Sequence, residues 1–222
     1  MKSTKLSSIK RACEINDVIF SKLICQFDNF NSELEIEHFI LSEIRQRNLK
    51  PAFYPIIATG KNAAIPHHKA NGSWYPGFLV MDFGVKVNGF CSDMTRTIFI
   101  GKPGKVQREL YDVVLNAQKK CVDMVEPGIV CKDVAHFNKK LLGKHWKKMK
   151  HKLGHGVGKK IHILPRVSFN SKHKLKKGEV ITIEPGVYYK GRYGIRIEDT
   201  LVVGGSVLTK SSKKLIVKKF RG

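Results

Sequence analysis

The chain has 222 residues, of which 42% are hydrophobic, and this is enough for one sizeable core or two tightly joined halves. No apolar run approaches the ~20 residues that a membrane span needs. The N-terminal sequence MKSTKLSSIKRACEIND also lacks the apolar stretch of a signal peptide. We therefore expect a cytoplasmic protein with no membrane partner.

The charge balance is strongly basic, with 41 lysines and arginines against 18 acidic residues. Residues 139–177 hold 14 basic residues and no acidic one, which is the kind of footprint that nucleic acids bind. No recognisable nucleic-acid-binding module accompanies this charge. We therefore interpret the stretch as a solvated lysine-rich surface and expect no specific nucleic-acid partner.

The five cysteines form no CxxC pair and are odd in number, which is typical of a reducing compartment. They are interpreted as core or surface thiols and comprise Cys13, Cys25, Cys91, Cys121 and Cys131.

Apolar spacing predicts two opening helices, over residues 7–27 and 32–47, the second capped by Ser32 with Glu35 three residues later. A strand is predicted over 52–58, followed by a loop that carries His67 and His68 and then by a β-hairpin.

The same order then begins again, with helices predicted over residues 105–124 and 132–142 and strands over 179–189 and 194–203. This order of elements suggests an internal duplication. The lysine-rich segment 209–222 is predicted to be a flexible tail.

The hairpin MDFGVKVNGFCSDMTRT carries two acids in strands that are otherwise apolar. Asn88-Gly89 favours a type I′ turn. If Val87 pairs with Phe90, Asp93 lies opposite Gly84, and Asp82 then shares its face. Two such close carboxylates call for a cation between them or for protonation of one.

Three further stretches supply similar groups: HKLGHGVGKKIH contains His151, His155 and His162, whereas VITIEPGVYY and YGIRIEDTLVV contain Glu184 and Glu198. Four carboxylates and an imidazole make a donor set that two divalent cations would balance. Such oxygen-rich donors suit Mn²⁺ or Co²⁺, with Zn²⁺ and Fe²⁺ as alternatives.

These stretches make the chain resemble the pita-bread metallopeptidases, which include methionine aminopeptidase, aminopeptidase P and prolidase. SDMTRT, EPGVYY and GIRIED, with GKNAAIPHH before the hairpin, look closest to the aminopeptidase P and prolidase branch. The resemblance implies an α+β fold with a pseudo-twofold β-sheet core flanked by helices. It also implies that residues 1–222 form one catalytic domain, without the separate N-terminal domain of that branch.

The resemblance further implies a role for each residue of the site. Asp82 would bind one metal, Asp93 and Glu198 would bridge two, and His155 and Glu184 would complete the second. Glu184 would also move a proton of the attacking water, and Arg196 would support the acidic ligands from behind. His67 and His162 would be catalytic residues that bind the substrate, and His151 a further substrate-site residue.

The implied function is a dinuclear metal-dependent aminopeptidase that acts on peptide substrates, with Xaa-Pro peptides preferred. The alternatives are methionine aminopeptidase activity and a catalytically silent relative that binds protein or nucleic acid. Ile163 stands where the family usually has an acid, and Lys159 and Lys160 stand where it is apolar or mixed. These departures predict an altered substrate preference.

Overall fold

The chain begins with two helices that pack on the first sheet. The computed structural model describes residues 4–221, and its first helices are α1 (Lys5–Cys25) and α2 (Glu33–Arg45). The side chain of Ser32 accepts a hydrogen bond from the backbone N–H of Glu35 at 3.2 Å, which confirms the predicted cap. The apolar faces of both helices are buried against the strands that follow.

The first sheet has four strands in the order β13-β6-β3-β2. Its members are β2 (Ile56–Thr59), β3 (Gly77–Phe83), β6 (Met94–Ile100) and β13 (Val217–Lys218). A smaller sheet of order β1-β4-β5 extends the hairpin and consists of β1 (Lys50–Pro51), β4 (Val85–Val87) and β5 (Phe90–Cys91). The strand predicted over 52–58 begins only at Ile56. Residues 52–55 leave the sheet because Phe53 turns toward a cavity and Tyr54 toward solvent.

The predicted hairpin register is confirmed. Asn88 and Gly89 have φ angles of 50° and 79°, as a type I′ turn requires, and Val87 pairs with Phe90. Nearer the core, Phe83 pairs with Met94 in the same register.

The two strands approach each other most closely at Gly84, where the ladder is interrupted between β3 and β4. A Cβ at this position would lie 2.0 Å from the carbonyl oxygen of Ser92, so only glycine fits. The register continues across the interruption, and Asp82 and Asp93 therefore face the same side.

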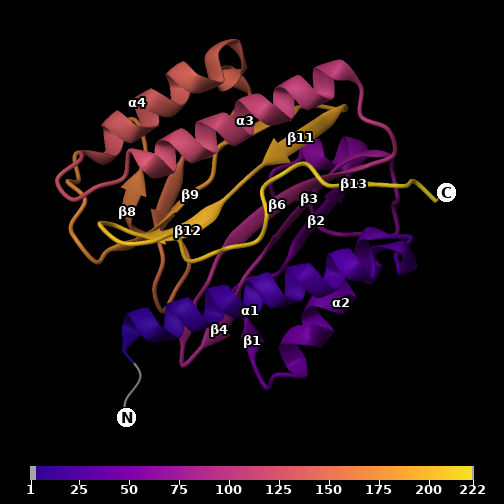
Figure 1. Ribbon diagram of the computed structural model, residues 1–222, viewed down its shortest axis with the longest axis horizontal. Helices are drawn as coiled ribbons and strands as arrows, with labels where there is room; N and C mark the ends of the chain where they lie inside the picture. Colours follow the sequence, from indigo (N-terminus) through magenta and orange to yellow (C-terminus); the bar gives the residue numbers. More distant parts are fainter. Residues whose placement is uncertain (1–3, 222) are drawn as a thin grey trace.

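The second half repeats the order of the first, with α3 (Lys105–Asp123) and α4 (Cys131–Leu142) preceding a sheet of order β12-β9-β7-β8 (Figure 1). The strands of this half are β7 (Gly154–Gly156), β8 (Ile163–Val167), β9 (Val180–Ile183), β10 (Gly186–Tyr189), β11 (Tyr193–Arg196) and β12 (Asp199–Val202). Strands β10 and β11 form a separate hairpin. Short 3₁₀ turns complete the elements: η1 (Phe27–Asn29), η2 (Gly60–Ala64) and η3 (Gly143–Lys148).

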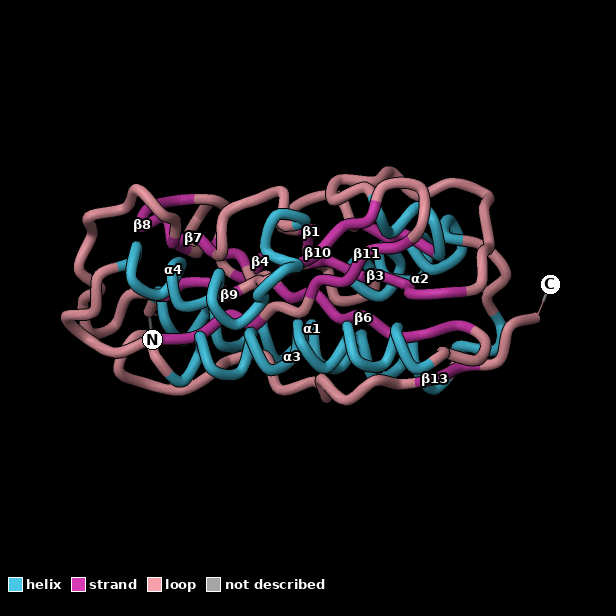
Figure 2. Tube along the Cα trace, turned by 90° about the horizontal axis from the view of Figure 1, so that it is seen from above, coloured by secondary structure: helices cyan, strands magenta, loops and turns pink. Residues whose placement is uncertain are grey.

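The two halves share a hydrophobic cluster at their junction. Phe78 of β3 and Phe99 of β6 meet edge to face at 5.0 Å between ring centroids and pack with Tyr111 of α3 and Ile195 of β11. Figure 2 shows the long helices α1 and α3 on one side of the strands.

The lysine-rich C-terminal segment differs from the flexible tail that its composition predicts. Buried Arg96 donates a hydrogen bond to the backbone carbonyl oxygen of Ser211 at 2.9 Å. The hydroxyl of Tyr111 donates to the backbone carbonyl oxygen of Lys213 at 3.0 Å. Strand β13 then pairs in parallel with β6. These contacts hold the backbone of the segment, whereas its lysine side chains supply the composition that suggested disorder.

Among residues 4–221, no helix has the length and apolarity needed to cross a membrane. All five cysteines are free, with Cys25 exposed and the other four buried. This agrees with their interpretation as core or surface thiols.

Candidate metal centre

Two of the predicted donors come from the N-terminal half. Asp82 lies on β3 and Asp93 between β5 and β6, and both side chains are largely buried. Burial, reinforced by the negative charges of Asp82 and Glu184, raises the pKa of Asp93 well above its ordinary value. The hairpin therefore holds two acids close together in a poorly solvated place.

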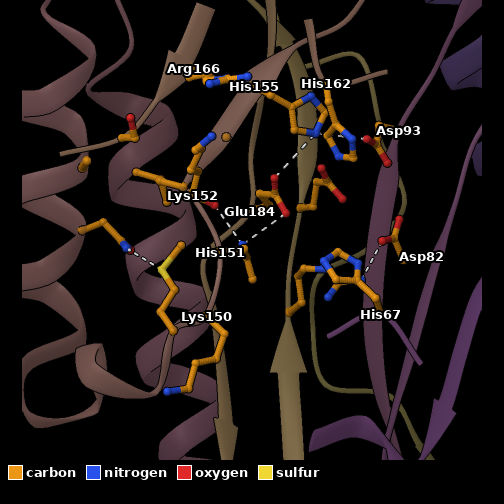
Figure 3. Close-up of a pocket in the computed structure, with 18 of the residues that line it drawn as sticks. His67, Asp82, Asp93, Lys150, His151, Lys152, His155, His162, Arg166 and Glu184 are labelled. Atoms are coloured by element: carbon orange, nitrogen blue, oxygen red, sulfur yellow. Dashed lines mark hydrogen bonds and ion pairs between the residues drawn. The ribbon is translucent and has the colours of Figure 1, made fainter. Parts of the chain in front are cut away.

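The other three donors come from strands of the C-terminal half. His155 lies on β7, Glu184 directly after β9, and Glu198 between β11 and β12. The Nε2 atom of His155 lies 3.4 Å from Asp93 Oδ2 and 3.6 Å from Glu184 Oε1. Figure 3 shows the side chains of His155, Asp93 and Glu184 pointing toward one another. The pseudo-symmetric halves thus contribute facing groups to one centre.

Within the described residues, Asp93, His155 and Glu198 each offer an atom of a metal-binding type, and these atoms lie within 4.8 Å of one another. Asp82 is directed partly elsewhere, because its Oδ2 accepts a hydrogen bond from Arg196 at 2.6 Å. Glu184 lies between the two histidines 155 and 151, with its Oε2 3.5 Å from Nδ1 of His151. All five predicted donors line the same cavity of about 710 Å³.

The electrostatics of the centre call for positive charge. Burial, followed by the charge of Glu198, raises the pKa of Glu184 to about 8. Burial and the charges of Asp93 and Asp82 raise the pKa of Glu198 well above its ordinary value. In the absence of cations, protons are thus retained on groups that would ionise in water at neutral pH.

Two carboxylate oxygens in the centre are buried without any hydrogen-bond partner in the described structure, Asp82 Oδ1 and Glu198 Oε1. Buried polar atoms nearly always have a hydrogen-bond partner. A buried carboxylate oxygen that has none, and that lies beside an imidazole, is free to coordinate a metal ion. The donor set therefore fits divalent cations both by charge and by these two free oxygens.

Arg196 contacts the acids on the side away from the cluster of donor atoms and is the residue that the family resemblance assigned to their support. The guanidinium is buried and donates to Asp82, to Thr95 Oγ1 at 3.1 Å and to the hydroxyl of Tyr188 at 2.8 Å. Thr95 in turn donates to Glu198 Oε2 at 2.7 Å. A single arginine thus orients acids from both halves.

The three other histidines of the predicted site, His67, His151 and His162, line the same cavity as the acids. His162 has a φ of 59° and its ring lies 4.4 Å, centroid to centroid, from that of His155. His151 bonds to the hydroxyl of Tyr188 at 2.8 Å. Burial and the nearby Arg196 lower the pKa of His151 to about 3, and burial and His155 lower that of His162. Both rings are neutral at neutral pH.

His67 sits on a loop that is fixed on both sides. Before it, the carbonyl oxygen of Pro66 accepts a hydrogen bond from Arg196 at 3.2 Å. After it, Nε2 of His68 lies 2.7 Å from Oε2 of the fully buried Glu33 on α2. The same carboxylate also accepts hydrogen bonds from Thr59, Asn62 and the backbone of Asn71.

Sequence reasoning missed three groups that shape the centre: Thr95, Tyr188 and the Glu33–His68 pair. Thr95 and Tyr188 lie inside SDMTRT and EPGVYY, so their place beside predicted donors was a usable signal. Glu33 carried no such signal, because it looks like an ordinary first-turn acid of a capped helix.

Comparison with known proteins places the chain in a class. Residues 7–204 match the model of metallopeptidase family M24, and the chain belongs to this family. Membership of this family implies divalent metal ions, and the carboxylate and histidine cluster is a group of side chains that could hold them.

Particular relatives are Xaa-Pro peptidases. The chain is 37% identical over 225 residues to an Xaa-Pro dipeptidase of Pyrococcus horikoshii, a match that covers 97% of this chain and 64% of the relative. The crystal structure of an X-Pro aminopeptidase from Thermotoga maritima is similar with a TM-score of 0.91 and 31% identity, over 96% of this chain and 63% of that one. The crystal structure of a prolidase from Pyrococcus horikoshii is similar with a TM-score of 0.90 and 36% identity, again over 96% of this chain and 63% of that one.

These similarities confirm the predicted α+β pita-bread fold. This chain spans less than two thirds of the length of each of these relatives.

Proposed function

We propose that the chain is a dinuclear metal-dependent aminopeptidase that hydrolyses the bond after the N-terminal residue, with Xaa-Pro peptides as its substrates. One observation carries the proposal: five donors from both halves converge in one cavity, and two of their buried oxygens lack partners. The relatives named as Xaa-Pro peptidases support the substrate class.

The ligands of the two cations would be Asp82, Asp93, His155, Glu184 and Glu198. Mn²⁺ is our first choice of metal because the set is rich in oxygen and has one imidazole, with Co²⁺, Zn²⁺ and Fe²⁺ as alternatives. Bound divalent cations supply an acidified water and polarise the scissile carbonyl. Arg196 keeps Asp82 oriented and, through Thr95, keeps Glu198 oriented as well.

The protein groups would handle protons and charge. Glu184 would accept a proton from the attacking water and pass it to the leaving nitrogen. His162 and His67 would donate hydrogen bonds to the carbonyl oxygen as negative charge develops on it. His151, hydrogen-bonded to Tyr188 and close to Glu184, would shape the substrate pocket beside that glutamate.

All of these groups lie between His67 and Glu198, inside the segment that matches the family model. We therefore infer that this segment holds the complete catalytic centre. The five free cysteines support our proposal of a reducing compartment such as the cytoplasm.

A peptide panel tests the proposed substrate. We expect Xaa-Pro dipeptides or Xaa-Pro-Yaa peptides to be hydrolysed at least ~10-fold faster in kcat/KM than matched Met-Ala-Yaa peptides, about 1.4 kcal/mol of differential transition-state binding. The measurement uses purified protein loaded in turn with Mn²⁺ and Co²⁺. Equal or faster cleavage of the methionine peptides would move the assignment to methionine aminopeptidase.

The loop anchor predicts a second effect. His68→Ala should lower kcat about 10-fold on an Xaa-Pro peptide with unchanged metal content, because the loop that carries His67 loses its bond to Glu33. His68→Gln, whose amide can still donate, should keep more of the activity. The matched control is His38→Ala, an exposed histidine of α2.

A double-mutant comparison separates positioning from stability. If His68 acts through His67, His68→Ala should cost little further activity in a His67→Ala background. An equal loss in both backgrounds would show that His68 does not act through His67.

A further inference from the structure

The acid-free stretch of residues 139–177 forms one wall of the cavity that the five predicted metal ligands line. Its residues run from the end of α4 through η3, β7 and β8. Lys150, Lys152 and Arg166 line the cavity, and Figure 3 shows them on the side away from Asp82 and Asp93. The cavity is therefore electrically polar, with carboxylates along one side and cationic side chains along the other.

These three cations differ from the other basic groups near the centre. Arg196 is paired with Asp82, and Arg96 and Lys213 are paired with Asp199. In the described part of the chain, no ion pair involves Lys150, Lys152 or Arg166, and all three side chains are exposed to solvent. Their charge is left for a group that comes from outside the protein.

A second hollow of about 460 Å³ adjoins the first. It shares Lys152, Arg166 and Ser168 with the main cavity, so these three side chains stand at the boundary between the two. Among the described residues, no acidic side chain lines it, although the lining His173 is paired with Glu179 at 3.0 Å. The remaining lining residues are neutral: Leu164, Pro165, Asn170 and Ser171. Hydroxyl and amide donors beside two cations suit a carboxylate.

The polarity of the cavity gives a bound peptide a direction. The scissile bond must lie against the metal ligands, and the unpaired charges of Lys150, Lys152 and Arg166 repel the positively charged amino terminus of a substrate. The residues after the scissile bond then extend toward the cationic side. The residue that follows the proline would thus reach the boundary formed by Lys152 and Arg166.

We propose that the second hollow is a subsite for a carboxylate on the residue after the proline, so that the protein selects Xaa-Pro-Yaa peptides in which Yaa is acidic. This inference rests on the proposed peptidase function and names its substrate class. It gives the basic stretch a role in substrate selection. The carboxylate can be the side chain of Yaa or its free C-terminus, and the two sources are separable by experiment.

The test compares Ala-Pro-Glu, Ala-Pro-Gln and Ala-Pro-Lys, each with a free and with an amidated C-terminus. Among the amidated peptides we expect kcat/KM for Glu to exceed that for Lys at least ~10-fold, and the ratio should shrink as salt is raised. If the terminal carboxylate is the group recognised, amidation of the Gln peptide should lower its kcat/KM by a similar factor.

Charge reversal locates the subsite. Lys152→Glu should abolish or invert the preference for Glu over Lys, whereas Lys119→Glu, the same charge change on the exposed face of α3, should leave it intact. Equal cleavage of all the peptides by an active enzyme would overturn the subsite. The same holds if an oligonucleotide of mixed sequence binds at physiological salt and loses affinity through Lys152→Glu, because the stretch would then serve nucleic acid.

Failure of the proposed function would be a different result. If no Xaa-Pro peptide is cleaved, the peptidase assignment fails, and the subsite is then judged by peptide binding to the Mn²⁺-loaded protein in calorimetry. Tighter binding of the amidated Glu peptide than of the Lys peptide, lost in Lys152→Glu, would support it. Equal dissociation constants would refute it.

Discussion

Asp93→Asn is expected to lower kcat/KM on an Xaa-Pro peptide by at least ~1,000-fold, about 4 kcal/mol, and to reduce bound Mn²⁺ below one ion per chain. The carboxylate of Asp93 is one of the three groups whose ligand atoms lie within 4.8 Å of one another. It is also, with Glu198, one of the two carboxylates that the family resemblance assigns to both ions, so its loss would remove charge from each of them. Chelation of the wild-type protein should have the same effect, and added Mn²⁺ or Co²⁺ should reverse it.

The loss should not arise from unfolding. Asp93 is buried among acids that raise its pKa, so a neutral amide of the same shape relieves repulsion in the metal-free protein. We expect metal-free Asp93→Asn to unfold at the same or a higher temperature than the metal-free wild type. Added Mn²⁺ should raise the unfolding temperature of the wild type but not of the variant, because only the former binds it tightly.

Elemental analysis after dialysis, thermal unfolding and peptide hydrolysis together check this prediction. Asp112→Asn, an exposed acid of α3, serves as the control and should keep both metal and activity. Full activity of the wild type in metal-free buffer would contradict the dinuclear centre.

Local chemistry made the hairpin predictable. Asn88-Gly89 admits few conformations other than a type I′ turn, and strand alternation then fixes the common face of Asp82 and Asp93. The cap at Ser32 is similarly a short-range effect, so it too was readable from the sequence. Both features depend on residues within a few positions of one another.

Contacts between the halves could not be derived in this way. Arg196 reaches Asp82 across 114 positions, and Thr95 reaches Glu198 across 103. Neither pair follows from composition or periodicity. The resemblance of the motifs to a known family placed Arg196, Asp82 and Glu198 in one site, but it did not point to Thr95. The bond from Glu33 to His68 could be found neither from short-range sequence effects nor from the family resemblance, because nothing near either residue points to the other.

The C-terminal segment illustrates a limit of composition. Its lysines suggested disorder, but the order of the segment depends on backbone carbonyls that buried Arg96 and Tyr111 require as acceptors. That requirement is set by the interior, far away in the sequence. Residues 52–55 were misjudged for a related reason, since Phe53 belongs to the cavity wall and not to the sheet.

Glu184→Gln is expected to lower kcat by ~10²- to 10⁴-fold, the usual contribution of a positioned general base or acid. Glutamine keeps the shape and an oxygen that can contact a cation, but it cannot take a proton from water or give one to the leaving nitrogen. Because Asp82, Asp93 and Glu198 are unchanged, the variant should still bind Mn²⁺, and KM should change far less than kcat.

Three measurements on one preparation decide the role of Glu184: metal content, KM and kcat for an Xaa-Pro peptide. Glu126→Gln, an exposed glutamate beyond the end of α3, is the control for the substitution itself. A variant that loses its metal would make Glu184 mainly a ligand, since the fall in kcat would then follow the ions. A variant that keeps its metal and retains kcat within about 3-fold of wild type would rule out proton transfer by Glu184.

The proton would then have to move through another group beside the scissile bond. His151 lies 3.5 Å from the Glu184 carboxylate, but it is poorly suited to this role because burial and Arg196 lower its pKa to about 3.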